Sequence, residues 1–130
     1  MKVHHIGIAV ESLKEAVPVF QKLLGSSPVR EETVEDQKAR VAVFSVGENR
    51  IELLEATAAD SPVGRFIAQR GPGIHHLTLS VKNLAESLLE LERNGIELVD
   101  HAPRSGAGHE RIAFLHPKST AGILIELIEE

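Results

Sequence analysis

The chain has 130 residues, of which 42% are hydrophobic and 25% charged, and it contains no cysteine, which excludes disulfides, a thiolate nucleophile and thiolate metal ligands. A formal net charge of −5, with four Phe and no Trp or Tyr, argues against a nucleic-acid-binding protein. No apolar run reaches the roughly 20 residues of a membrane span, and the N-terminus lacks a secretion signal, so we expect a cytoplasmic protein.

The first predicted element is a half-buried strand at 4–10, where "HHIGIAV" alternates with a period of two. A helix is predicted next, because Ser12 and Glu15 have the spacing of a capping box. Apolar residues then recur at helical intervals as far as Gly25. Pro18 lies inside this helix, so we expect a kink or a shortened helix.

Two strand-like runs follow the first helix, "ARVAVFSV" at 39–46 and "RIELLEA" at 50–56, with a turn between them. After them, "DSPVGRFIAQRG" predicts a linker helix over 61–70. Ser61 would be its N-cap residue and Pro62 its first residue, both of which favour a helix start.

The second half repeats the order of the first. "HHLTLSV" at 75–81 predicts a strand, and Asn83 with Glu86 predicts a helix start, followed by apolar residues at helical spacing up to Gly95. The strand-like runs after this helix lie at 96–102, 111–116 and 122–129.

An internal repeat therefore organises the chain as a single domain of two units, at about 1–57 and 72–130. Each unit is predicted to be a βαβββ module that ends in an acidic strand, "IELLE" or "IELIE". Because one module alone cannot cover both faces of its sheet, we expect an α+β fold. In it, the two modules form an open, half-barrel mixed sheet around a metal site.

Four residues in matching places of the repeat are candidate metal ligands. Strand alternation places His5 and His76 on the face with small or polar neighbours, and the other histidine of each pair on the apolar face. Glu52 and Glu126 lie mid-strand in apolar runs, where a carboxylate is costly to bury without a cation.

Two imidazoles and two carboxylates form a ligand set that suits a divalent cation such as cobalt, the foremost candidate, or Zn, Ni, Mn or Mg. The remaining histidines outside the two pairs lack this symmetry and are assigned to loops or to supporting positions: His101, His109 and His116.

These features resemble the vicinal-oxygen-chelate superfamily and, over nearly the whole chain, the methylmalonyl-CoA epimerase family within it. The most specific similar segments are "DSPVGRFI" and "RIAFLHPKSTAGILIEL". The resemblance implies the paired modules, a dimer, the ligands His5, Glu52, His76 and Glu126, and interconversion of the two epimers of methylmalonyl-CoA.

In such a reaction a cation stabilises the enolate that forms when the proton next to the thioester is removed. Some members of the family carry a glutamate base where this chain has Val41. The resemblance therefore leaves Glu126 as one base, which is also a ligand, and the second base unassigned. Glu52 and Gln37 are weaker candidates for positioning or proton transfer.

The nucleotide end of CoA carries phosphates, which need cations nearby. Lys118 and Arg111 are the candidate contacts, with solvated surface charges as the alternative interpretation.

Two other functions fit the same scaffold. A glyoxalase I-like lyase would use the same ligand types on a hemithioacetal. A non-catalytic small-molecule-binding protein would lack the metal ligands and would offer aromatic walls, whereas this chain has the ligands and few aromatic residues.

Overall fold

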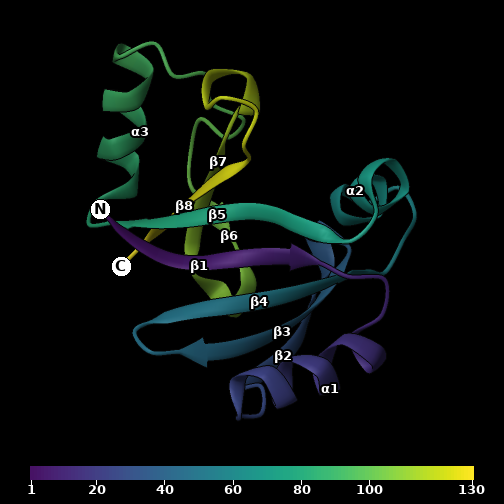
Figure 1. Ribbon diagram of the computed structural model, residues 1–130. Coiled ribbons are helices and arrows are strands. Elements are labelled where there is room, and N and C mark those ends of the chain that lie inside the picture. The colour runs from purple at the N-terminus through teal and green to yellow at the C-terminus, as the bar shows by residue number, and fades with distance from the viewer. The chain divides into compact units, whose positions relative to one another are not determined.

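The computed structural model describes all residues from 1 to 130, except for the side chain of residue 107 (Figure 1). The elements in chain order are β1 (Lys2–Ala9), α1 (Leu13–Leu24), β2 (Arg30–Val34), η1 (Glu35–Gln37), β3 (Ala39–Val46), β4 (Asn49–Ala56), α2 (Pro62–Arg70), β5 (Gly73–Val81), α3 (Leu84–Arg93), β6 (Arg104–Ser105), η2 (Ala107–His109), β7 (Arg111–Leu115), η3 (Pro117–Ser119) and β8 (Ile125–Glu129). The order β1-α1-β2-β3-β4 and then β5-α3-β6-β7-β8 confirms the predicted α+β fold of two βαβββ modules.

The residue contacts divide the chain into two compact units. The first unit is His5–His75, and the second consists of Met1–His4 with His76–Glu130. In the first, the strand order is β2-β3-β4-β1, with β1 parallel to β4 and the other neighbours antiparallel. In the second, the order is β5-β8-β7-β6, with β5 parallel to β8 and the rest antiparallel.

One helix covers one face of the sheet in each unit. The apolar face of α1 packs on a cluster that includes Phe44 and Leu53, both fully buried, with Ile8 of β1 at its margin. In the second unit Leu84 and Leu88 of α3 pack on Leu79, Val81, Ala113, Leu115 and Leu127. The alternate residues of the strands therefore point to the other face of each sheet, away from the helix.

The predicted N-caps are present, and each helix start has a second bond to a glutamate distant in the sequence. Ser12 Oγ accepts the N–H of Glu15 at 3.3 Å, and Asn83 Oδ1 accepts that of Glu86 at 3.1 Å. The first N–H of each helix donates to a glutamate at the end of a strand: Leu13 to Glu55 Oε1 at 2.7 Å, and Leu84 to Glu129 Oε2 at 2.9 Å. These two glutamates therefore also cap the two helices.

The helix that contains Pro18 is not shortened. It continues from Leu13 to Leu24 and ends at Gly25, whose φ of 70° is the left-handed conformation that glycine adopts at a helix end. The linker helix is confirmed as α2, with Ser61 Oγ accepting the N–H of Gly64 at 2.9 Å and Pro62 in the first turn. Within the described part of the chain, no helix has the length and apolar character needed to cross a bilayer.

The predicted strand at 96–102 is wrong. Only Leu98 forms a β-bridge there, with Leu115. The side chain of Asp100 accepts the N–H of Phe114 at 2.8 Å, so this segment follows β7 through side-chain and single backbone bonds instead of a ladder. The second strand of this module is the two-residue β6.

Two further boundaries differ from the prediction. The strand β2, at Arg30–Val34, was not predicted, because its sequence "REETV" is mostly polar. The last strand, β8, begins at Ile125 instead of residue 122, after the turn that contains Gly122.

Candidate functional site

In the first unit a buried histidine and a buried glutamate lie side by side on neighbouring strands. Parallel pairing of β1 with β4 sets Gly7 opposite Glu52, and His5 shares the face of Gly7 because it is two residues away. The side chains of His5 and Glu52 are 3% and 6% exposed. Their nearest atoms, His5 Nε2 and Glu52 Oε2, are 3.3 Å apart.

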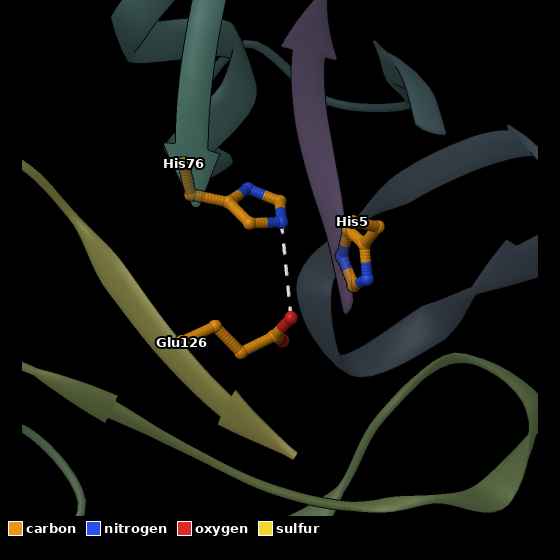
Figure 2. A group of neighbouring side chains, drawn as sticks. All are labelled: His5, His76 and Glu126. Carbon is orange, nitrogen blue, oxygen red and sulfur yellow. Dashed lines mark ion pairs between the residues drawn. The ribbon is translucent and has the colours of Figure 1, made fainter. Parts of the chain in front are cut away.

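The second unit places the same pair in the same way. Thr78 lies opposite Glu126 in the parallel pairing of β5 with β8, and His76 lies two residues before Thr78. His76 and Glu126 are each 6% exposed, and His76 Nε2 lies 3.8 Å from Glu126 Oε1. Figure 2 shows this pair, with the imidazole of His76 directed toward the carboxylate. All four candidate residues are thus buried, each pair within its own unit.

The second pair has a hydrogen bond from a neighbouring threonine. Thr78, which is fully buried, donates its hydroxyl to Glu126 Oε1 at 2.6 Å. Its counterpart in the first module is Gly7, which has no side chain to donate toward Glu52. The carboxylate of Glu126 is therefore oriented by a residue of the neighbouring strand β5.

The chemistry of these donors fits a cation. A buried carboxylate is costly unless a positive charge or several hydrogen bonds compensate it, and each module buries one beside an imidazole. Imidazole nitrogen and carboxylate oxygen together are a donor set that several first-row divalent metals accept.

The first histidine of each pair has a different environment, as the alternation predicts. His4 Nε2 lies 3.4 Å from Glu130 Oε2, a carboxylate at the end of the chain. The ring of His75 packs edge-on against Phe66 of α2, with 5.2 Å between centroids. Neither contact involves the four candidate ligands.

The three other histidines lie outside the strands, as expected. His101 pairs with Glu92 at 3.2 Å on the surface. His109 ends the short helix η2, and His116 caps η3 by accepting the N–H of Lys118 at its Nδ1.

The two cations predicted to contact CoA are engaged with carboxylates on the surface of the second unit. Lys118 Nζ lies 3.1 Å from Glu97 Oε2, and Arg111 Nη1 lies 3.0 Å from Glu129 Oε1. Their side chains are 70% and 55% exposed. Their role toward a phosphate stays a prediction.

The glutamate at the end of β8 is held in its charged form. The N–H of Leu84 is the main cause that lowers the pKa of Glu129 below its ordinary value of 4.5. Burial opposes this shift in pKa, and the charge and the hydrogen bond of Arg111 lower the pKa further. This carboxylate therefore joins β8, which carries Glu126, to the start of α3.

The position that carries a glutamate in some members of the resembled family is apolar here. Val41 is 3% exposed on β3 and faces Glu32 of β2 across the ladder. Gln37, the other weak candidate, ends the short helix η1 and is half-buried.

Two residues at the second pair were not singled out from the sequence. Thr78 was noted only as a polar neighbour of His76, although its hydroxyl bonds to Glu126. Phe114 is paired with Glu126 on β7, and its ring meets that of His76 edge-on with 6.2 Å between centroids. The alternating pattern of β7 could have placed Phe114 on the same face of the sheet as His76 and Glu126. Only the pairing register of β7 with β8 shows that Phe114 lies opposite Glu126.

Comparisons with known proteins agree with this geometry. The family described as the glyoxalase/bleomycin resistance protein/dioxygenase superfamily matches residues 4–114. An uncharacterized protein of Bacillus subtilis, YqjC, is 42% identical, over 98% of this chain and 91% of that protein.

Two similar solved structures are named methylmalonyl-CoA epimerase. The one from Mycobacterium tuberculosis is 36% identical, with a TM-score of 0.95, and covers 98% of this chain and 87% of its own. A variant of the Streptomyces coelicolor enzyme, in complex with 2-nitronate-propionyl-CoA, is 31% identical with a TM-score of 0.95. The match covers 100% of this chain and 94% of that chain. These matches confirm the predicted resemblance and support an isomerase of the epimerase type.

Proposed function

Because the chain belongs to the glyoxalase/bleomycin resistance protein/dioxygenase superfamily, we propose that it is a metal-dependent epimerase that interconverts (R)- and (S)-methylmalonyl-CoA. The observation that carries the proposal is the duplicated pair of a buried histidine and a buried glutamate, at 3.3 Å in one module and 3.8 Å in the other. The named epimerases, which match nearly the whole chain, support the choice of substrate.

In this proposal His5, Glu52, His76 and Glu126 together hold one divalent cation, with cobalt as the first candidate. The burial of both carboxylates supports the assignment, because each needs a compensating positive charge. When bound, such a cation would stabilise the negative charge that develops on the thioester oxygen.

The chain's own carboxylates would move the proton. Glu126 is proposed as the base that takes the proton from the carbon between the thioester and the carboxylate. The C–H bond breaks, its electron pair remains in the enolate, and the proton goes to a carboxylate oxygen. Glu52, from the other module, is the proposed candidate for returning a proton to the opposite face, which inverts the centre. The hydrogen bond from Thr78 would keep Glu126 oriented for its part.

Three further assignments belong to the same proposal. Residues 1–130 would act as a single domain, and the protein would form a homodimer in the cytoplasm. Lys118 and Arg111 would contact the phosphates of CoA by exchanging their present carboxylate partners, the exposed Glu97 and the half-buried Glu129.

Proton exchange tests this function. Purified protein loaded with cobalt is incubated in deuterium oxide with (R)-methylmalonyl-CoA, and loss of the C2 proton and of optical purity are followed together. We expect fast exchange of the C2 proton and fast loss of optical purity, and we expect both processes to stop after a chelator removes the cation. A parallel assay with methylglyoxal and glutathione tests the glyoxalase I-like alternative. Activity only in that second assay would contradict the proposal.

A further inference from the structure

The face of the second unit's sheet that carries His76 and Glu126 continues across two more strands. Phe114 of β7 is paired with Glu126, and Ile112 of β7 is paired with Arg104 of β6. Directly paired residues of antiparallel strands point to the same face, and so do residues two apart on one strand. Arg104 therefore lies on the face of the histidine and the glutamate, opposite the face that α3 covers.

Arg104 is held in place by two contacts. Its guanidinium lies over the ring of Phe114, with Cζ 5.2 Å from the centroid. Its Nε lies 3.4 Å from Asp100 Oδ2, the same oxygen that accepts the N–H of Phe114 at 2.8 Å. The aromatic ring that Arg104 covers is also the ring that meets His76 edge-on. The guanidinium, the ring and the imidazole thus form one connected row.

The backbone beside Arg104 is also fixed. Gly106 donates its N–H to the carbonyl of Glu110 at 2.9 Å. A Cβ added to Gly106 would lie 2.9 Å from two carbons of Ile112, which is closer than real side chains approach. This glycine lets the segment after β6 lie directly on β7, so the short strand that carries Arg104 cannot shift freely.

The Nη nitrogens of Arg104 are available for a ligand. Within the described residues, the ion pair with Asp100 through Nε and the stacking on Phe114 are the contacts of this guanidinium. The side chain is 40% exposed. A guanidinium that is stacked on a ring and paired through Nε keeps its two Nη groups as donors, and these suit a carboxylate or a phosphate through two parallel hydrogen bonds.

We propose that Arg104 binds the free carboxylate of a malonyl-type thioester at this site. The inference rests on the proposed function, and it adds to it a residue that selects substrates with a second, ionised carboxyl group. Ile112, Phe114 and Ile128 form an apolar cluster on the same face of the sheet. This cluster would contact the small aliphatic part of the acyl group. Because a CoA phosphate offers the same chemistry, the test separates the two anions.

The test measures binding to metal-free protein by calorimetry, so it does not depend on epimerisation. Methylmalonyl-CoA is compared with propionyl-CoA, which carries the same phosphates but lacks the carboxylate. Arg104→Ala is the main variant. Arg104→Lys keeps the positive charge but lacks the planar guanidinium that can donate two parallel hydrogen bonds. Arg93→Ala removes an exposed charge from the last turn of α3 and is the matched control.

We expect wild-type protein to bind methylmalonyl-CoA more tightly than propionyl-CoA. Arg104→Ala should weaken methylmalonyl-CoA binding about tenfold or more, and Arg104→Lys should recover part of the loss. Propionyl-CoA binding should change less than about twofold, and Arg93→Ala should change neither. An equal loss for both thioesters would assign the contact to a phosphate and overturn the proposal.

Two other results would also overturn it: no preference for methylmalonyl-CoA in the wild-type protein, or no loss in Arg104→Ala. Circular dichroism checks folding of each variant. If Arg104→Ala does not fold, Asp100→Asn replaces it, because an amide oxygen can still accept the N–H of Phe114 while the charge that holds Arg104 is lost. We expect Asp100→Asn to weaken methylmalonyl-CoA binding several-fold. Unchanged binding in this variant would contradict the proposal. Absence of epimerisation would instead count against the proposed function.

Discussion

Replacing Thr78 by Val tests whether Glu126 is a metal ligand that its neighbour orients. Valine has nearly the shape of threonine but lacks the hydroxyl that donates to Glu126 Oε1 at 2.6 Å. Both side chains are buried, at 0% and 6% exposure, so water cannot readily replace the bond. A hydrogen bond to a charged group contributes about 1.5–3 kcal/mol. Since 1.4 kcal/mol corresponds to about a factor of ten, Thr78→Val should lower the affinity for cobalt or zinc about 10- to 100-fold.

The affinity is measured by competition with a chromophoric chelator, and circular dichroism confirms folding of the metal-free variant. Ser80→Ala is the matched control, because it removes a buried hydroxyl from the same face of β5, two residues further along. Its affinity should stay within about twofold of wild type. An equally small change in Thr78→Val would refute the reasoning that this hydroxyl orients a ligand.

Two predictions concern stability. Leu88 of α3 is 1% exposed, so Leu88→Ala should lower the free energy of unfolding by about 2–5 kcal/mol. Leu89 is 55% exposed, so Leu89→Ala should lower it by less than about 1 kcal/mol. Equal losses of the two variants in urea titrations would contradict the assigned buried face of α3. Because the pKa of Glu129 is lowered in the folded state, its charge stabilises the protein above about pH 4.5, and this contribution disappears as the pH falls through the lower, folded value. Glu129→Gln should therefore lower the melting temperature at pH 7, and the difference in melting temperature from wild type should disappear in acid. A difference that does not change with pH would refute this role of the Glu129 charge.

Much of the candidate site follows from local patterns. Alternation in the two repeated strands selects His5 and His76 over their neighbours, and the structure buries both in that way. Glu52 and Glu126 were selected because carboxylates in apolar strand runs need compensation, and each lies beside the histidine of its module. The repeat made these inferences strong, because the same pattern had to hold twice.

The contacts that escaped prediction join residues far apart in the sequence. Glu55 and Glu129 cap helices that begin 42 and 45 residues earlier, and no local pattern contains such a bond. The segment 96–102 alternates like a strand, yet Asp100 bonds through its side chain to β7. Arg104 lies on a two-residue strand, too short to produce a periodic signal. Only the pairing of β6 with β7 and of β7 with β8 shows that Arg104 lies on the same face of the sheet as Glu126.

The most direct test of the account is the metal content of the purified protein after loading with cobalt and dialysis. If the histidine and glutamate pairs of the two modules share one cation, elemental analysis should find one metal ion per chain. Both His5→Ala and His76→Ala should then lose it while keeping the wild-type circular dichroism spectrum. Two ions per chain, or one ion retained by either variant, would contradict the shared site.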